Sequence, residues 1–424
     1  MRYLDKYDIL SCSQYGFRKR LSTQDAILDL TSLIAREIDK GKKVLAIFLD
    51  LKKAFDTASV PILVRRLKGI GIRGTALSLF TSYLQNRSQK VKIDGYYSDE
   101  CEVIYGVPQG SVLGPTLFLI YINELCNLGC AGGRIFSYAD DTAIVFTGGS
   151  WLEVESVASE GLRRVYRWLT DNLLTLNIQK TNYICFSTYQ SFQPEPNFLI
   201  RIHNCLPQDS LTCNCPYIEK VSFTKYLGVI IDQRLSWHPH LELLMCRVRK
   251  LIWIFKALRH VMDRKLCTKI YVALAQSVIT YCIPIWGGAT KSNLIDLERA
   301  QRSLIKVLCF KSFRFPTDHL YIFSDLLSVR RLYIINLILK YHKSLPYNPN
   351  VLNKRRHDIV ARVHPVRTAF AKRQYECQSP FLYNKINKEL NIYPMTLFTC
   401  KITLDKWLKE LTFEEVELFL CRTI

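Results

Sequence analysis

The sequence predicts an α+β fold, in which an antiparallel sheet packs on helices and a region that is helical throughout follows. Three observations support this prediction. Before Trp237, short apolar runs typical of strands alternate with amphipathic helical patterns. Two of these runs flank a tight turn, which predicts an antiparallel hairpin. From Trp237 onward the apolar spacing is helical, so we expect a boundary near Ser236.

The expected elements of the first region follow from apolar period and from breakers. The continuous apolar run KVLAIFLDL is typical of a strand that is buried on both faces. The run LVRRLKGIGIRG is typical of a helix that ends at a glycine-rich turn. Expected strands cover 43–51, 89–95, 100–106, 134–138, 142–146, 181–187 and 224–232, and expected helices cover 63–74, 116–125 and 150–174.

We expect three parts in the chain, namely 1–236, 237–320 and 321–424. Between Leu241 and Leu320 there are 14 Lys and Arg against 5 Asp and Glu. Helices with such a surplus indicate a platform for a nucleic-acid backbone, although ordinary solvated helix faces explain the same count. The last part combines apolar helices with a basic loop at 353–373, and its pattern indicates no chemistry.

The composition excludes several classes of protein. The 424 residues are 49% hydrophobic, which indicates a folded chain, and the net charge of +21 favours a polyanionic partner such as nucleic acid. No apolar stretch is long enough to span a membrane, and no feature indicates a protein partner. The 15 cysteines follow no framework and no targeting signal opens the chain, so we expect an intracellular protein of the cytoplasm or nucleus.

A zinc site was also considered for the cysteine-rich segment. Cys213 and Cys215 follow Cys205 and His203, but they are not a C-x2-C pair and no second pair follows. The spacing therefore argues against zinc.

Two adjacent carboxylates, Asp140 and Asp141, stand in FSYADDTAIVF between the two hairpin strands. By itself this pattern favours a polar hairpin tip in water. Asp50, however, ends the buried strand that begins at Lys43. If the strands are neighbours, three carboxylates converge at one sheet edge. Hard oxygen ligands select Mg²⁺ or Mn²⁺, and two such ions are suited to nucleotidyl transfer.

Five ordered motifs resemble those of reverse transcriptases. FLDLKKAFDT (48–57), GVPQGSVLGP (106–115) and YADD (138–141) resemble motifs A, B and C. LTLNIQKTNYICF (174–186) looks like motif D and KYLGVIID (225–232) like motif E. With QYGFRKRLSTQDAI (14–27), they resemble non-LTR retrotransposon polymerases of the jockey-like, LINE type, over about 15–308. The resemblance implies a right-hand polymerase palm with partial fingers, then an α-helical thumb.

The resemblance also implies an RNA-directed DNA polymerase and assigns roles to residues. Its metal ligands would be Asp50, Asp140 and Asp141, with the carbonyl of Leu51. Phe55 would exclude a ribose 2′-hydroxyl, unless it is a core aromatic. Asp56 is expected to be a helix cap. The implied partners are an RNA template, a DNA primer and dNTPs.

Further roles come from the other motifs. Gln109 and Gly110 would approach the nucleotide and template, with an ordinary turn as the alternative. Lys180 would lie near the leaving pyrophosphate, unless it is one more surface lysine. Arg18 or Arg20 would bind the triphosphate, and the sequence does not distinguish them. The expected primer-grip hairpin contains Tyr226, Leu227 and Gly228.

The chain also departs from the family pattern. Few residues precede Gln14, whereas the family carries an upstream fingers segment and an endonuclease. We therefore expect an N-terminally truncated polymerase. A catalytically inactive RNA-binding remnant is the alternative, and a group II intron-type maturase, which shares the palm, is a weaker one. RNase H and zinc-knuckle signatures are not found.

Overall fold

The computed structural model describes residues 1–130, 132–189, 192–203, 214–345, 361–363 and 365–420. The chain divides into two compact units. The first comprises Met1–Leu30 and Gly41–Leu227, and the second Thr31–Lys40 and Gly228–Ile424. The packing therefore changes at Leu227 and does not separate 237–320 from 321–424. The three functional parts expected from the sequence remain a prediction.

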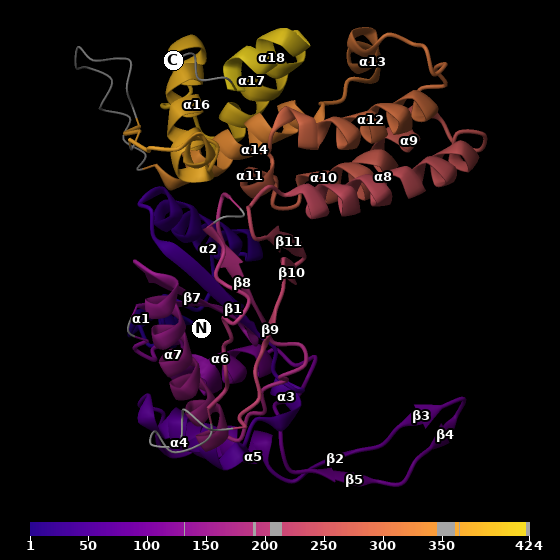
Figure 1. The fold of residues 1–424 in the computed structure, drawn as a ribbon. Helices are drawn as coiled ribbons and strands as arrows, with labels where there is room; N and C mark the ends of the chain where they lie inside the picture. Colours follow the sequence, from indigo (N-terminus) through magenta and orange to yellow (C-terminus); the bar gives the residue numbers. More distant parts are fainter. Residues whose placement is uncertain (131, 190–191, 204–213, 346–360, 364, 421–424) are drawn as a thin grey trace. The chain divides into compact units, whose positions relative to one another are not determined.

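A sheet forms the centre of the first unit (Figure 1). Its described strands lie in the order β6-β7-β1-β8-β9, and only β8 and β9 are parallel. The strands are β1 (Lys43–Leu49), β6 (Gly133–Tyr138), β7 (Asp141–Gly148), β8 (Asn182–Phe186) and β9 (Glu219–Lys220). The central position of β1 brings the end of this strand beside the β6–β7 hairpin.

Strand β1 is buried on both faces, as predicted. Every residue from Val44 to Leu49 is buried, because helices cover one face of the sheet and Tyr226 contacts Phe48 on the other, at 5.5 Å between ring centroids. The covering helices are α4 (Val60–Gly69), α6 (Gly114–Cys126) and α7 (Trp151–Asp171).

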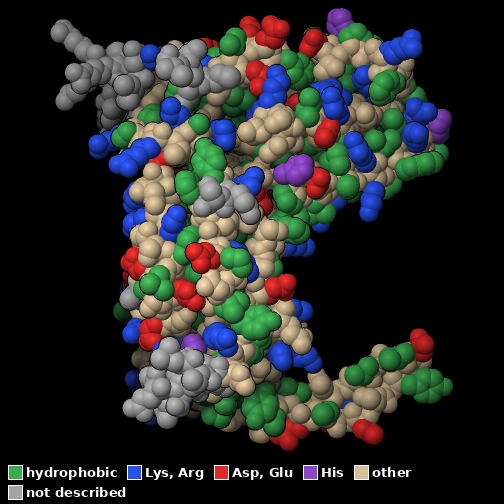
Figure 2. Space-filling model, viewed as in Figure 1, with side chains coloured by type: hydrophobic (Ala, Val, Ile, Leu, Met, Phe, Trp, Pro, Cys, Tyr) green, Lys and Arg blue, Asp and Glu red, His purple; other side chains and the backbone are tan. Residues whose placement is uncertain are grey.

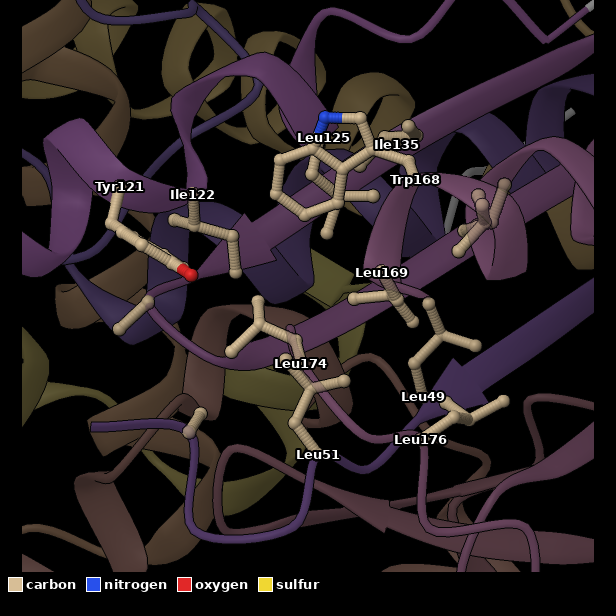
Figure 3. Close-up of a cluster of buried hydrophobic side chains, with 14 of the residues drawn as sticks. Leu49, Leu51, Tyr121, Ile122, Leu125, Ile135, Trp168, Leu169, Leu174 and Leu176 are labelled. Atoms are coloured by element: carbon tan, nitrogen blue, oxygen red, sulfur yellow. The ribbon is translucent and has the colours of Figure 1, made fainter. Parts of the chain in front are cut away.

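The core of the first unit reaches the loops that follow the strands. Figure 3 shows Leu51 and Leu174 in one cluster with Leu169 of α7 and Ile122 of α6. Leu49 and Leu176 lie beside each other in the same cluster. Burying these loop side chains fixes the backbone at the end of β1, where Asp50 lies.

The long helix α7 begins as predicted. The Ser150 hydroxyl accepts a hydrogen bond from the Glu153 amide at 3.2 Å, and the Glu153 carboxylate accepts one from the Gly149 amide at 2.7 Å. This reciprocal cap satisfies amides that a helix start leaves unpaired. The helix ends at Asp171, before the predicted 174, because Leu173 adopts a positive φ of 55°.

The remaining expectations for the first unit are largely confirmed. The strand pair expected at 89–95 and 100–106 forms, as β2 with β5 and, farther out, β3 with β4. The expected strand 224–232 is wrong as one strand, because positive φ angles at Leu227 and Gly228 break it into β10 and β11. The remaining elements are α1 (Arg2–Lys6), α3 (Ala54–Thr57), α5 (Gly74–Leu84), β2 (Arg87–Gln89), β3 (Lys92–Ile93), β4 (Tyr96–Tyr97), β5 (Cys101–Val103) and β10 (Phe223–Tyr226).

The described part of the second unit is mainly helical. Helix α8 (His238–Leu258) packs along α12 (Lys291–Leu308), as Figure 1 shows. The buried Gln301 amide donates to the Tyr271 hydroxyl at 2.9 Å and accepts from the Val329 amide at 3.1 Å, which ties three helices together. No helix in the described ranges is long and apolar enough to cross a membrane.

The other elements of this unit are part of α2, one strand, several short helices and the helices of the C-terminal region. They are the second half of α2 (Thr23–Asp39), β11 (Val229–Asp232), α9 (Arg264–Tyr271), the π-helix η3 (Val272–Gln276), α10 (Ser277–Thr280), α11 (Ile283–Trp286), α13 (Thr317–Ser324), α14 (Val329–Ser344), α15 (Ala369–Lys372), α16 (Tyr375–Leu390), α17 (Leu397–Glu410) and α18 (Phe413–Leu420).

Candidate active site

The register of the sheet brings the predicted carboxylates together. The last β1–β7 pair is Leu49 with Thr142, so Asp50, the next residue, is level with Asp141. Asp141 pairs with Tyr138 as the first residue of β7. The turn between the strands therefore consists of Ala139 and Asp140. Asp141 belongs to the strand, which corrects the expectation that it lies in the turn.

The pKa values of the Asp140 and Asp141 carboxyls are both raised. For Asp140 the largest cause is burial, and the negative charge of Asp50 adds to it against opposing backbone hydrogen bonds. For Asp141 burial is again the largest cause, followed by the charges of Asp140 and Asp50. The three carboxylates thus repel one another, and a cation among them would relieve that repulsion.

A buried glutamine holds the turn through hydrogen bonds to its backbone. Gln14 Oε1 accepts hydrogen bonds from the amides of Ala139 at 2.9 Å and Gly16 at 2.8 Å. Its Nε2 donates to the Ser137 hydroxyl at 3.1 Å. Gln14 opens the QYGF stretch, and its local sequence pattern did not predict this contact.

Asn177 holds the third carboxylate, Asp50, through hydrogen bonds. Asn177 Nδ2 donates to Asp50 Oδ2 at 2.7 Å, and the Asn177 amide donates to the Asp50 carbonyl at 2.8 Å. The Thr181 hydroxyl accepts from the Asp50 amide at 3.2 Å. Asn177 was also missed. In the motif D segment that contains Asn177, only Lys180 was predicted to have a role.

The N–H and C=O groups of Leu51 do not bond to Leu176, although these two residues lie opposite each other. It forms an antiparallel bridge with Leu176, in which the bonds run from the Lys52 amide to the Thr175 carbonyl and from the Asn177 amide to the Asp50 carbonyl. Bonds between the flanking residues mean that the Leu51 carbonyl points away from Leu176. The Leu51 carbonyl therefore makes no hydrogen bond in this bridge.

Phe55 is half-buried and stacks on Phe118 of α6, with 4.0 Å between ring centroids and 19° between ring planes. Its ring is thus held by the core. Asp56 is not a helix cap, which corrects the expectation. It lies inside α3, whereas Lys53 and Ser59 occupy the N-cap positions of α3 and α4.

The loop 106–115 packs against the turn that contains Phe55 and Asp56. The Val107 amide donates to the Phe55 carbonyl at 2.9 Å, and Gln109 Nε2 donates to Asp56 Oδ1 at 2.6 Å. Gly106 has a φ of 82°, and a Cβ there would lie 2.8 Å from the Asp56 backbone. Only glycine permits this approach. Gly110, with a φ of 73°, has open space around it.

The predicted basic residues differ in their surroundings. The Arg18 guanidinium donates to the carbonyls of Ser11 at 2.7 Å and Gln14 at 3.3 Å. Arg20 and Lys180 are exposed. Arg18 is therefore engaged with the backbone of its own segment, whereas the other two face solvent.

The predicted primer-grip residues lie at the division between the two units. Tyr226 is 4% exposed, and its hydroxyl donates to the Phe136 carbonyl at 3.3 Å, so its side chain belongs to the core of the first unit. Leu227 ends that unit, and Gly228 begins the second. Burial raises the pKa of Tyr226, and the charge of Asp141 adds to the rise.

The donor set fits a hard divalent cation by its chemistry, because it consists of carboxylate and carbonyl oxygens. In the described residues no three His, Cys, Asp or Glu side chains form a group that could hold a metal ion as they stand. The three predicted carboxylates thus lie at the same edge of the sheet, but their side chains do not surround a common metal position. Of the zinc pattern considered, Cys205 and Cys213 lie outside the described residues.

Comparisons with known proteins place the chain in a family. Residues 2–231, more than half of the chain, match the family model described as reverse transcriptase (RNA-dependent DNA polymerase). The chain is 29% identical over 310 residues to the probable RNA-directed DNA polymerase from transposon BS of Drosophila melanogaster, covering 71% of this chain and 33% of that protein. It is 26% identical to the polymerase from mobile element jockey of Drosophila funebris, covering 81% of this chain and 36% of that protein.

The chain thus spans about a third of the length of these relatives. Among solved structures, telomerase from Candida albicans in complex with a fragment of telomeric RNA is similar at 12% identity and a TM-score of 0.43, over 97% of this chain and 58% of that chain. The jockey-like resemblance inferred from the motifs is confirmed by the sequence relatives. The chain therefore belongs to the reverse transcriptase (RNA-dependent DNA polymerase) family.

Proposed function

We propose that this chain is the polymerase region of a non-LTR retrotransposon RNA-directed DNA polymerase. It adds dNTPs to the 3′-hydroxyl of a DNA primer on an RNA template. The observation that carries the proposal is that Asp50, Asp140 and Asp141 share one sheet edge inside the segment that matches the family. In a right-hand polymerase the sheet is the palm, residues before it belong to the fingers, and 237–320 form the thumb.

Mg²⁺, or Mn²⁺ in its place, would be held by the three carboxylates and the Leu51 carbonyl. When bound there, such ions would supply Lewis-acid activation of the primer hydroxyl and charge stabilisation of the leaving pyrophosphate. The protein contributes preorganisation. Gln14 and Asn177 hold the turn and Asp50 in place through buried or half-buried hydrogen bonds, so little reorganisation is required when charge develops.

The nucleotide would be recognised by Phe55 and by the loop 106–115. Because Phe118 holds the Phe55 ring, that ring can exclude a 2′-hydroxyl sterically and leave it without a hydrogen-bond partner. One N–H of the Gln109 amide is bound to Asp56, which orients the side chain and leaves its oxygen and its second N–H for the nucleotide. Gly110 allows the template backbone to approach closely.

Arg20 is the better candidate for the triphosphate, because Arg18 already donates to two backbone carbonyls. A guanidinium offers the paired donors that phosphate accepts. Lys180 lies on the segment that holds Asp50 and faces solvent, where it can donate a proton to the leaving pyrophosphate. The residues Tyr226, Leu227 and Gly228 would position the primer through their backbone.

The template strand would also contact the second unit. Four phenylalanine rings lie on α13 or in the segment between α12 and α13, each with a cation over it, and three of them are exposed. Figure 2 shows basic and hydrophobic side chains interspersed over this part of the unit. We call this set the basic-aromatic surface. Its pairs are Arg259 with Phe310 at 5.4 Å, Arg264 with Phe323 at 4.0 Å, Lys306 with Phe313 at 5.5 Å, and Lys311 with Phe315 at 4.9 Å and Phe323 at 4.0 Å.

This pairing of groups suits single-stranded nucleic acid. Bases stack on exposed aromatic rings, while adjacent cations neutralise phosphates. Phe313 is 85% exposed, which is unfavourable in water and leaves much of the ring accessible to a base beside the Lys306 ammonium.

A catalytically inactive RNA-binding remnant is the second candidate. It is favoured by one observation, namely that the described carboxylates do not form a closed metal-binding group. It would bind RNA through the same basic-aromatic surface without synthesising DNA.

Primer extension separates the two candidates. Purified chain is incubated with oligo(dT) on poly(A) RNA, Mg²⁺ and dTTP, and product length is measured. The proposal predicts extension that Asp141→Ala abolishes and that the exposed control Asp171→Ala retains. Salt-sensitive RNA binding without extension by the unaltered chain would establish the remnant instead.

A further inference from the structure

The side chain of Gln14 bonds the acidic turn at Ala139 and the neighbouring Ser137, together with Gly16 of its own segment and the Cys126 sulfur of α6. It is fully buried, with 0% exposure. Because backbone amides can only donate, the two amides of Gly16 and Ala139 fix which end of the side chain is the oxygen. The nitrogen is then directed to the Ser137 hydroxyl, and the more distant Cys126 sulfur lies 3.9 Å away.

Ser137 completes this network. Its hydroxyl accepts from Gln14 and, at 3.2 Å, from the Thr142 hydroxyl, and it donates to the Ala139 carbonyl at 2.9 Å. Both peptide groups of Ala139 are thus bound, one by Gln14 and the other by Ser137. A buried network in which every donor has an acceptor favours a single conformation.

The turn needs this support because its backbone conformation is unfavourable. Ala139 has a φ of 59°, a region that residues with a Cβ rarely adopt. The segment of Gln14 is itself held against β6, through bonds from the Tyr15 amide to the Ser137 carbonyl at 2.8 Å and from the Ser137 amide to the Ser13 carbonyl at 2.9 Å. Gly16 lies so close that a Cβ on it would be 2.6 Å from the Ala139 nitrogen.

We propose that Gln14 is a positioning residue that fixes the Ala139–Asp140 turn and thereby sets the affinity of Asp140 and Asp141 for the divalent cation. The inference rests on the proposed function, because it takes the two carboxylates as metal ligands. It makes the segment 13–16, which carries no ligand, a part of the metal site.

The test measures metal affinity directly as well as activity. Gln14→Met keeps the length of the side chain and removes its hydrogen bonds. The matched control is Gln301→Met, since Gln301 is equally buried and bonds to Tyr271, Leu327, Tyr321 and Val329 in the second unit. Both variants lose the same chemical group, so both should unfold at a lower temperature. Mn²⁺ affinity is read from the electron paramagnetic resonance signal of free Mn²⁺, without substrate.

We expect Gln14→Met to weaken Mn²⁺ binding about tenfold, the loss typical of removing a residue that supports a ligand, and to raise the half-saturating Mg²⁺ in primer extension similarly. Gln301→Met should change neither constant. Equal metal constants for Gln14→Met and the unaltered chain, with only a lower melting temperature, would overturn the inference while the proposed function stands. If Asp141→Asn leaves Mn²⁺ binding unchanged and the unaltered chain does not extend primers, the proposed function itself fails.

Discussion

Asn177 Nδ2 donates a 2.7 Å hydrogen bond to Oδ2 of Asp50, and the Asn177 amide binds the Asp50 carbonyl at 2.8 Å. One residue thus holds both the side chain and the backbone of the carboxylate that ends β1. The bond to Oδ2 fixes the orientation of the carboxylate and leaves Oδ1 without this donor. Residues that orient a ligand in this way commonly change activity without touching the substrate.

Replacing Asn177 tests this relationship. Asn177→Leu should lower the rate of primer extension about 10- to 100-fold, because Asp50 loses its orienting donor. The KM for dTTP should change less than kcat. Asn384→Leu is the control, since the Asn384 amide binds the backbone of Ala361 in the second unit. Equal losses for both variants would show that only general stability is affected.

Shortening Phe55 should relax the choice of sugar. Phe55→Val should raise incorporation of ribonucleotides relative to dNTPs by about tenfold, which corresponds to the ~1–3 kcal/mol cost of an unpartnered hydroxyl. Competition between UTP and dTTP in single-nucleotide extension measures the ratio. Phe118→Leu removes the ring that holds Phe55 and should raise the ratio in the same direction, but less than Phe55→Val does. A ratio that Phe55→Val does not alter would remove Phe55 from sugar recognition.

The basic-aromatic surface should bind single-stranded RNA through its rings. Phe313→Ala should weaken binding of an oligo(U) RNA about 5- to 100-fold, since a stacked base contributes ~1–3 kcal/mol. Fluorescence anisotropy at several salt concentrations measures this. The control is Phe398→Ala, which removes an equally exposed ring, 74% exposed, from α17. Equal effects of the two substitutions would argue against a specific surface.

Lowering the pH should destabilise the second unit through His240. Burial lowers the pKa of His240 to about 4, and the charge of Arg247 contributes. The unfolded chain, with a pKa of about 6.5, binds the proton first, so stability is full above 6.5 and falls as the pH drops toward 4. The loss is about 3 kcal/mol. Urea unfolding at pH 7.5, 5.5 and 4.5 measures it.

His240→Phe should flatten this pH dependence, because it removes the titrating group from a packed site beside Trp286. The exposed His319→Phe is the control and should leave the slope intact. A slope that persists in His240→Phe would assign the acid sensitivity to other groups.

The sequence predicted the parts of the fold that depend on local pattern. The run from Lys43 predicted β1, and the alternation around the acidic pair predicted the β6–β7 hairpin. The positions of Asp50 and Asp141 followed, because a buried strand that ends in a carboxylate exposes it at the sheet edge. The predicted start of β7 was one residue too late, at 142 and not at Asp141. The length of the turn depends on the φ of Ala139, which the pattern does not encode.

The contacts that support the site could not be predicted in the same way. Gln14 and Ala139 are 125 residues apart, Asn177 and Asp50 are 127 apart, and Gln109 and Asp56 are 53 apart. Such bonds depend on which strands become neighbours, and local periodicity does not encode that. Asp56 illustrates the difference. Its sequence surroundings indicated a cap, whereas the folded chain pairs it with a loop glutamine.

The central claim is that the shared sheet edge is a polymerase active site. The most direct measurement is the initial rate of Mg²⁺-dependent dTTP incorporation on oligo(dT)–poly(A) by the unaltered chain and by Asp50→Asn, Asp140→Asn and Asp141→Asn, each with its melting temperature. We expect measurable incorporation by the unaltered chain and a loss of about a thousandfold or more in each variant at unchanged stability. Incorporation at the unaltered rate by any folded variant would contradict it.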